Sequence, residues 1–181
     1  MSQVFFISDL HIAHRNIIKF QDNYRAKVLG VETIEQHDEK ICDLWNDTVH
    51  KRDLVINLGD TGDGFRILKK LPGAKKILLG NHDKLHAKEY LEVFDDIIGP
   101  IKYKSFWLSH FPIHRDEFFG KKVLHGHSHS KGIANENYIN LSIEMTGGYP
   151  ISFQDIVGGK FVTHNRVNLS YEDIVKINQS N

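Results

Sequence analysis

Leu79-Gly80-Asn81-His82-Asp83 is the stretch that decides how this chain folds and what it can do. It follows the apolar run 76–79 and places an amide, an imidazole and a carboxylate next to one another. Inside a strand or a hydrophobic core these side chains are unfavourable, because unpaired polar groups are costly to bury. Where a strand ends, however, all three can point into one cleft. We therefore interpret this stretch as the end of a buried strand and the edge of a polar site.

Four further fragments have the same design, with polar side chains at the end of an apolar run. They are Ile7-Ser8-Asp9-Leu10-His11, Leu58-Gly59-Asp60, Leu108-Ser109-His110 and His125-Gly126-His127-Ser128-His129. Taken alone, Asp9 and His11 are equally compatible with a helix N-cap and a surface histidine. The set as a whole is unlike a chance pattern, because each fragment repeats the order of apolar run and metal-type side chain.

The first half of the chain alternates between expected strands and expected helices. Strands are expected at 4–7, 53–58 and 74–79, and helices at 65–71 and 87–94. This alternation predicts parallel strand–helix–strand units. Ligands of such sheets bind at the carboxyl ends of the strands, which is where the polar fragments lie.

The remaining elements are expected from local signals. Thr33 and Gln36 form a capping box that predicts a helix to about residue 49, with His37 and Trp45 on its buried face. The second half is richer in expected strands, at 105–108, 121–124, 138–142 and 160–163. A helical turn is expected at 155–157 and a final helix at 170–177.

The composition is that of a globular protein, and it argues against a disulfide-bonded protein, a membrane-spanning protein and a protein that coats long nucleic acid. The 181 residues are 40% hydrophobic and 25% charged, and Lys+Arg and Asp+Glu are both 23, so the net charge is zero. This balance disfavours binding to long nucleic acid, although a nucleotide or a nucleic-acid end stays possible. The single cysteine, Cys42, excludes internal disulfides. Without a signal peptide or an apolar segment of about 20 residues, we expect one cytoplasmic domain over 1–181.

The side chains at the strand ends suit metal ions. They are Asp9, His11, Asp60, Asn81, His82, His110, His127 and His129. Carboxylates and imidazoles bind Zn²⁺, Mn²⁺ and Fe. There are too many for one four-coordinate ion, so we expect two divalent metal ions with Asp60 as the bridging carboxylate. We favour Mn²⁺, while Fe, Zn²⁺, Ni²⁺ and Mg²⁺ stay open.

Over residues 4 to about 145, these motifs resemble those of the calcineurin-like metallophosphoesterase superfamily. The matching motifs are Asp9-x-His11, Gly59-Asp60-x-x-Asp63, Gly80-Asn81-His82-Asp83, the lone His110 and Gly126-His127-x-His129. The resemblance implies an α/β fold, a four-layer α/β/β/α sandwich of two mixed sheets flanked by helices. It also implies a hydrolase of phosphate esters.

The resemblance also implies roles for individual residues. One metal ion would be held by Asp9, His11, Asp60 and His129, and the other by Asp60, Asn81, His110 and His127. A hydroxide between the two ions would attack phosphorus in line with the leaving oxygen. His82 would lie near the leaving group as a proton donor or a charge stabiliser, and Asp63 would orient its ring. Asp83 would either orient His82 or cap the next helix.

One departure bears on the substrate. Gly64 stands where phosphoprotein phosphatases of the superfamily carry an Arg that grips phosphate. We expect His14, Arg15 or Asn16 to bind the phosphate instead. The preferred interpretation is a phosphodiesterase acting on a small phosphate ester or a nucleotide. The alternatives are a phosphomonoesterase or protein phosphatase, a nuclease, and a non-catalytic protein-interaction module, and the sequence does not fix the oligomeric state.

Overall fold

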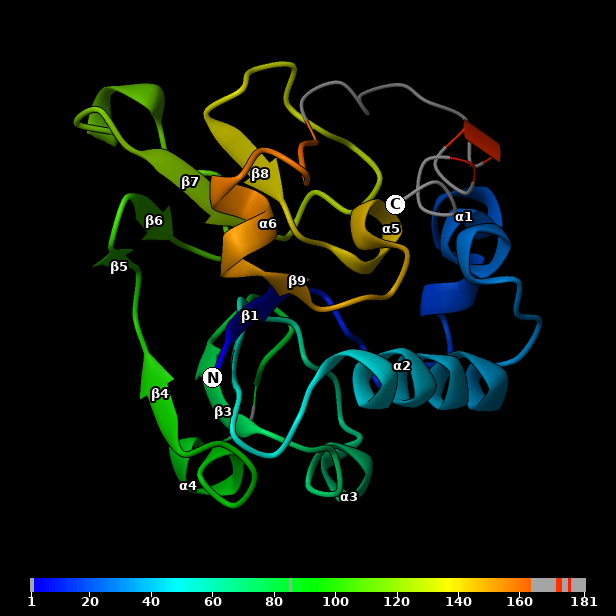
Figure 1. Ribbon diagram of the computed structural model, residues 1–181. Coiled ribbons are helices and arrows are strands. Elements are labelled where there is room, and N and C mark those ends of the chain that lie inside the picture. The colour runs from blue at the N-terminus through cyan, green and yellow to red at the C-terminus, as the bar shows by residue number, and fades with distance from the viewer. Residues whose placement is uncertain (1, 85, 164–171, 174–175, 177–181) are drawn as a thin grey trace.

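The computed structural model describes residues 2–84, 86–163, 172, 173 and 176, which form two β-sheets with helices around them (Figure 1). The first sheet has the strand order β4-β3-β2-β1-β9 and the second the order β5-β6-β7-β8. The strands of the first sheet are β1 (Val4–Ile7), β2 (Leu54–Asn57), β3 (Ala74–Leu78), β4 (Asp96–Ile98) and β9 (Ile151–Ser152). Those of the second are β5 (Ile101–Tyr103), β6 (Phe106–Leu108), β7 (Lys122–His125) and β8 (Tyr138–Asn140).

Among the described residues, the first two α-helices have 10 and 15 residues, and the four that follow have four or five residues each. The α-helices are α1 (Phe20–Leu29), α2 (Ile34–Thr48), α3 (Phe65–Leu68), α4 (Ala87–Tyr90), α5 (Ile143–Thr146) and α6 (Phe153–Val157). Two 3₁₀ turns are η1 (Ile17–Lys19) and η2 (Arg115–Glu117). None of the helices in the described part of the chain is long and apolar enough to cross a lipid bilayer.

The strand register brings the polar fragments to one edge. In the first sheet β1, β2 and β3 are parallel, and Ile7, Asn57 and Ile77 lie side by side near their carboxyl ends. In the second sheet β6 and β7 are also parallel, with Leu108 opposite Leu124. The two sheets meet next to this edge, where the N–H of Ser8 donates to the carbonyl of Leu141 at 3.0 Å. The segments that leave these strand ends therefore converge.

Two hydrophobic cores hold this arrangement. The core between the first sheet and its helices buries Phe5 and Val55 of the strands against Ile41 and Trp45 of α2. The core between the sheets buries strand residues of both, including Phe6 of β1. Strands β1 and β2 are therefore covered on both faces, which accounts for their uninterrupted apolar sequences.

The predicted fold class is confirmed, since two mixed sheets are flanked by helices. Helix α2 is also confirmed, and Thr33 and Gln36 form the predicted capping box. The helices predicted at 65–71 and 87–94 are shorter, with bounds Phe65–Leu68 and Ala87–Tyr90. In both, turns of the i→i+3 type replace the last part of the predicted helix, as where the N–H of Leu71 donates to Leu68.

The strand predicted at 160–163 is wrong, because this segment is irregular. The N–H groups of Lys160 and Phe161 donate to the carbonyl of Asp155, which closes the end of α6 instead of a strand ladder. The ring of Phe161 fills the core between the sheets. The strands β4, β5 and β9, the helices α1 and α5 and the two 3₁₀ turns were not predicted. The helix predicted at 170–177 lies largely outside the described residues.

A buried carboxylate ties the starts of the two central strands together, and this gives a stability prediction. Asp53 is 3% exposed, and its side chain accepts hydrogen bonds from the N–H groups of Gln3 and His50, both at 2.8 Å. The bond from Gln3 is the main reason that the pKa of Asp53 lies below its ordinary value of 3.8. A carboxyl group with a lowered folded-state pKa stabilises the fold above its unfolded pKa, and this contribution is lost as the pH falls through the folded value.

We therefore expect Asp53→Asn to lower the free energy of unfolding by about 1–2 kcal/mol at pH 7. The difference from the wild type should shrink below pH 3.8, where the wild-type carboxylate itself becomes protonated. Urea unfolding at pH 7, 5 and 3 measures both effects. Asp47→Asn, an exposed position of α2, is the matched control. An equal loss at pH 3 and pH 7 would contradict the assignment of the effect to the charged carboxylate.

Candidate metal centre

The side chains expected to bind metal gather at one edge of the two sheets. Asp9 and His11 follow β1, Asp60 follows β2, and Asn81 and His82 follow β3. The residues that follow the second sheet are His110 after β6, and His127 and His129 after β7. The buried members of the set are Asp9, His11, Asp60, His110 and His129, whereas Asn81, His82 and His127 are exposed. The site therefore has a buried floor and an open rim.

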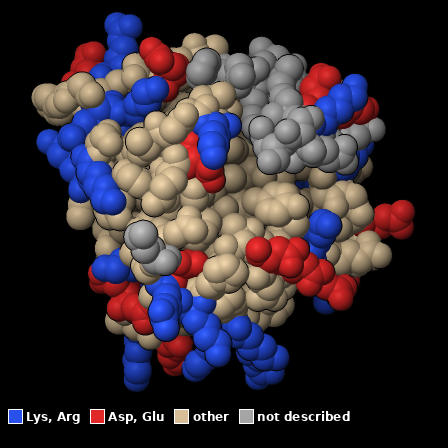
Figure 2. All heavy atoms as spheres, viewed as in Figure 1, with Lys and Arg blue, Asp and Glu red and all other residues tan. Residues whose placement is uncertain are grey.

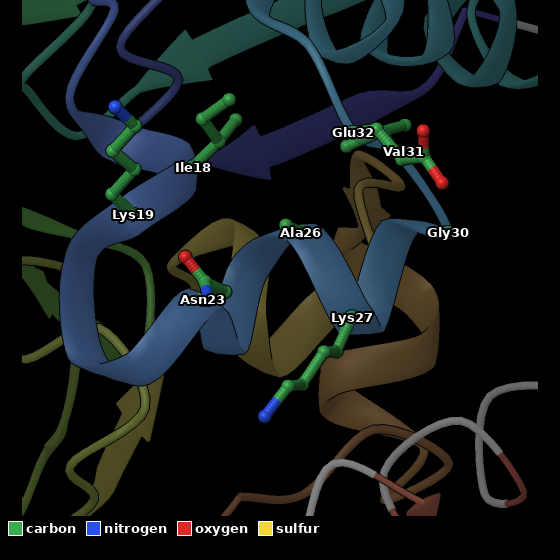
Figure 3. Close-up of a pocket in the computed structure, with 8 residues that line it drawn as sticks. All are labelled: Ile18, Lys19, Asn23, Ala26, Lys27, Gly30, Val31 and Glu32. Carbon is green, nitrogen blue, oxygen red and sulfur yellow. The ribbon is translucent and has the colours of Figure 1, made fainter.

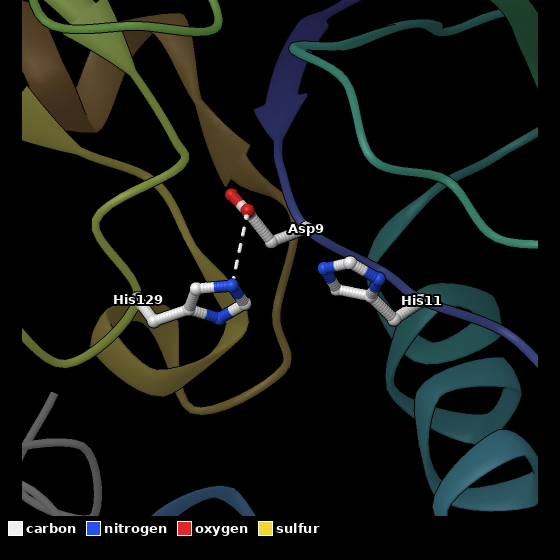
Figure 4. Close-up of side chains that lie close together, drawn as sticks. All are labelled: Asp9, His11 and His129. Carbon is white, nitrogen blue, oxygen red and sulfur yellow. Dashed lines mark ion pairs between the residues drawn. The ribbon is translucent and has the colours of Figure 1, made fainter. Parts of the chain in front are cut away.

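The first cluster consists of Asp9, His11 and His129 (Figure 4). Each of the three offers a ligand atom within 4.8 Å of the other two. The Nε2 atom of His129 lies 3.7 Å from Oδ1 of Asp9. The rings of His11 and His129 are stacked, with centroids 5.3 Å apart. The structure thus brings His129 next to Asp9 and His11, which precede it in the chain by 120 and 118 positions.

The second cluster surrounds His110. Ligand atoms of Asp9, Asp60 and His110 lie within 4.8 Å of one another. The Nε2 atom of His110 is 3.4 Å from Oδ2 of Asp60 and 3.1 Å from Oδ1 of Asn81. The same Asn81 oxygen lies 2.9 Å from Nδ1 of His127. The four residues grouped around the second expected metal ion are therefore neighbours, and Asp9 reaches both clusters.

The chemistry of these side chains fits divalent cations. Both ring nitrogens of His11 are buried and have no hydrogen-bond partner among the described residues. This state is costly, and binding of a metal ion to the ring would relieve it. Burial is the main cause that lowers the pKa of His11 to about 2, so the ring is neutral. Burial opposes ionisation of Asp60, but the hydrogen bond and the charge of His110 outweigh it and lower its pKa to about 2. A neutral imidazole and an ionised carboxylate are the forms that bind metal.

The backbone turns sharply at the site. Asp9, His11, Asp60, His127 and His129 all have positive φ, between 49° and 64°. Non-glycine residues are uncommon in this region, and such strain costs about 1–3 kcal/mol per residue. These turns come directly after strands that both cores hold in place, so they are imposed by the surrounding structure. They aim the side chains of successive strand ends into one cleft.

Two motif glycines allow the carboxylates to approach closely. A Cβ atom at Gly80 would collide with Oδ1 of Asp60, and one at Gly126 would collide with Oγ of Ser8 and Oδ2 of Asp9. Any larger residue at either position would therefore displace Asp60 of the second cluster or Asp9, which belongs to both clusters.

Sequence reasoning missed the pair that supports His129. Glu144 of α5 and Arg25 of α1 are each 1% exposed. The Arg25 Nε–H donates to Glu144 Oε1 at 2.8 Å, and the same oxygen accepts from Nδ1 of His129 at 3.0 Å. With its proton on Nδ1, the ring of His129 presents the lone pair of Nε2 toward Asp9. No local pattern marks this pair, because its members lie 119 positions apart.

The residues predicted to bind substrate differ in their placement. The ring of His14 is half-buried and lies 5.5 Å from that of His11 and 6.2 Å from that of His82, measured between centroids. Arg15 and Asn16 are exposed. In the described part of the chain, His14 is thus the member of this group that contacts the cleft.

His82 lies over the first cluster. Its ring is exposed with its centroid 5.3 Å from that of His11, and its backbone N–H donates to Oδ1 of Asp60 at 2.8 Å. Asp63 is exposed, and its N–H donates to the carbonyl of Ile12. No hydrogen bond joins the Asp63 carboxylate to His82 among the described residues, so its role as an orienting group stays a prediction.

Asp83 holds two of the loops together. Its carboxylate accepts hydrogen bonds from the N–H groups of Asp60, Thr61 and Gly80, at 2.7, 3.0 and 2.8 Å. The first two belong to the segment after β2 and the third to the segment after β3. Asp83 therefore fixes the backbone on which Asp60 and Asn81 are mounted.

Comparison with known proteins agrees with this geometry. The family model described as calcineurin-like phosphoesterase matches residues 2–172. The chain is 27% identical to the Gene 66 protein of Mycobacterium phage L5 over 80% of this chain and 86% of that protein. It is 31% identical to the Gene 66 protein of Mycobacterium phage D29, over 72% of this chain and 80% of that protein. It is 26% identical to an uncharacterized protein of Methanocaldococcus jannaschii, over 96% of this chain and 99% of that protein. A solved structure of a protein of unknown function from Aquifex aeolicus is 28% identical, with a TM-score of 0.70, over 87% of this chain and 99% of that one.

The buried pair behind His129 gives a prediction for metal affinity. We expect Glu144→Gln to weaken Mn²⁺ binding about 10- to 100-fold, because it removes the charge that holds the His129 proton on Nδ1. Isothermal titration calorimetry measures the affinity, and circular dichroism checks that the variant is folded. Glu136→Gln is the matched control, since Glu136 pairs with Lys122 at the surface. An unchanged affinity in a folded Glu144→Gln protein would contradict a role in positioning His129.

Proposed function

This chain belongs to the calcineurin-like phosphoesterase family, whose members are hydrolases of phosphoric esters, and from this premise we propose that it is a phosphodiesterase acting on small diesters. The family and the two clusters of ligand atoms support a metal-dependent phosphoesterase. Preference for a diester, the choice of metal and the roles of single residues are the parts that we propose.

We propose that Asp9, His11, Asp60 and His129 hold one divalent ion. Asn81, His110 and His127 hold the second together with Asp60, and Mn²⁺ is the ion we favour. When bound, such a pair of ions neutralises phosphate charge and makes water a nucleophile near neutral pH. The position of Asp60 supports its bridging role, because Oδ2 lies 3.8 Å from Nε2 of His11 and 3.4 Å from Nε2 of His110.

We assign proton transfer to His82. Its ring is exposed at the mouth of the cleft beside His11, so a bound ester can reach it. The hydrogen bond from its N–H to Asp60 ties its position to that of the metal ligands. An imidazole in this place can donate a proton to the leaving oxygen. His14, whose ring faces both His11 and His82, completes the polar wall on this side.

The observation that carries the diester preference is the packing around Gly64. A Cβ atom at this position would collide with Cγ2 of Ile12, so the Ile12 side chain occupies the space that a phosphate-gripping arginine would need. Arg25 is the buried guanidinium near the site, and Glu144 and the carbonyl of Leu10 already accept its hydrogen bonds. A phosphate monoester approaches two negative charges at neutral pH, whereas a diester carries one. A cleft rimmed by imidazoles suits the smaller charge.

The surface charge supports a small substrate. On the face shown in Figure 2, Lys and Arg side chains are interspersed with Asp and Glu side chains. The net charge of zero agrees with this distribution. A protein that binds a long nucleic acid relies on a concentration of positive charge along its surface.

The test compares a diester with a monoester. We expect metal-free protein to be inactive, and added Mn²⁺ to restore hydrolysis of bis(p-nitrophenyl) phosphate with a higher kcat/KM than that of p-nitrophenyl phosphate. Asn81→Ala should lower this value about 100-fold, since it removes an oxygen between His110 and His127. Release of p-nitrophenol measures the rates.

Asn46→Ala, at an exposed position of α2, is the matched control and should keep wild-type rates. A preference for the monoester would assign the protein to the phosphatases. Absence of turnover with any divalent metal, despite metal binding, would overturn the enzymatic proposal and favour a protein-interaction role.

A further inference from the structure

An apolar pocket opens beside the candidate metal centre. It has a volume of about 380 Å³ and lies where β3, β4 and β6 end, at the same edge as the metal-type side chains. Its lining includes Leu79, Ile98, Gly99, Pro100, His110 and Phe111. This volume is in the range of small-molecule sites, about 300–1,000 Å³. The proposed roles use the imidazole of His110, but none of them uses the apolar side chains of this pocket.

The pocket is continuous with the second cluster through one aromatic ring. Phe111 is 46% exposed, and its ring centroid lies 4.9 Å from that of His110 and 4.5 Å from that of His127. Leu79, directly before Gly80 and Asn81, is 37% exposed. Large apolar side chains are thus left open to solvent beside ligand atoms, where they can contact a bound molecule.

A second hollow offers a useful contrast. It has a volume of about 620 Å³ and is lined by residues of η1, α1 and the segment before α2, among them Lys19, Lys27 and Glu32 (Figure 3). Among the described residues that line it, none is one of the eight metal-centre side chains. The smaller pocket, by contrast, has His110 in its wall.

The two sides of the metal centre have different surroundings. His82 and His14 lie with His11 on one side, whereas Phe111 lies with His110 and His127 on the other. With His82 as the proton donor, the leaving group occupies the first side. The organic group that stays on the phosphate then has the second side available, which leads into the apolar pocket.

We propose that this pocket binds the organic group that the phosphate diester retains, and that this group is an aromatic ring. The inference rests on the proposed function, because it concerns the substrate of that same site. A flat ring can stack on Phe111 and cover Leu79 and Pro100, which removes apolar surface of both partners from water. An aryl group and the base of a nucleoside share this chemistry, and the experiment separates them.

The test varies the retained group and keeps the leaving group constant. Bis(p-nitrophenyl) phosphate retains an aryl group and methyl p-nitrophenyl phosphate retains a methyl group, while both release p-nitrophenol. The p-nitrophenyl ester of thymidine 5′-monophosphate retains a nucleoside. The aryl diester is intrinsically more reactive than the methyl diester. The measured quantity is therefore the ratio of kcat/KM for the aryl diester to kcat/KM for the methyl diester, compared between the wild-type protein and each variant.

We expect Phe111→Ala to lower this ratio about tenfold through KM, a loss similar to that of one base–aromatic stack. Leu79→Ala should lower it less, and both variants should affect the aryl ester more strongly than the methyl ester. Phe119→Ala and Leu91→Ala are the matched controls, at residues 70% and 54% exposed outside the pocket. Calorimetric titration with Mn²⁺ checks that the variants keep their metal sites. If Phe111→Ala also lowers kcat/KM for the nucleoside ester relative to the methyl ester, the ring that the pocket binds is a base. If kcat/KM for the nucleoside ester does not fall, the ring is a simple aryl group.

Binding without turnover separates the failure of this inference from that of the proposed function. Phenylphosphonate should bind the Mn²⁺-loaded protein more tightly than methylphosphonate, and Phe111→Ala should abolish the difference. If no ester is hydrolysed but phenylphosphonate binds more tightly than methylphosphonate, the pocket inference is supported and the phosphodiesterase proposal is wrong. If hydrolysis occurs but neither the ratio nor the phosphonate difference responds to Phe111→Ala and Leu79→Ala, the pocket inference is wrong.

Discussion

The carboxylate of Asp60, held between two groups of histidines, is the feature on which the rest of the site depends. It lies at 1% exposure after the central strand β2, with His11 on one side and His110 on the other. A buried carboxylate is unfavourable unless charges and donors surround it. Here the N–H of His82 and the ring of His110 supply them. The parallel register of β1, β2 and β3 is what brings the neighbouring strand ends close enough to do so.

Stability and function have opposite local requirements in this fold. Five side chains of the site sit on backbone with positive φ, and within the described part of the chain the ring nitrogens of His11 have no hydrogen-bond partner. Each of these features costs free energy. The compensation lies outside the cleft, in the two cores and in bonds such as those that Asp83 accepts from three backbone N–H groups. Strain that persists under such constraint is typical of sites prepared for a ligand, and cations that fill the two clusters would relieve part of it.

The sequence predicted what is encoded locally and missed what depends on distant partners. The strands β1, β2 and β3 and the capped helix α2 are apparent from apolar runs and from Thr33 and Gln36, because these signals lie within a few residues. The two-residue strand β9 exists through its antiparallel pairing with β1, and β5 through its pairing with β6, so neither has a clear local signal. The positions of the metal-type residues were predictable from strand ends. The Arg25–Glu144 pair and the pocket were not, because each is assembled from segments far apart in the chain.

The metal-type side chains and the apolar pocket beside them belong to different parts of the fold, so substrate preference can change without a change in the metal centre. The metal-type side chains come from strand ends fixed by both cores, so substitutions there disturb the shared chemistry. The pocket wall instead includes Gly99 and Pro100, which lie in the link between β4 of the first sheet and β5 of the second. Both are exposed, and a Cβ atom at Gly99 would meet no atom within 4 Å. The shape of the pocket can therefore vary through this link while Asp60 and its histidines keep their geometry, which separates recognition of the organic group from hydrolysis of the phosphate ester.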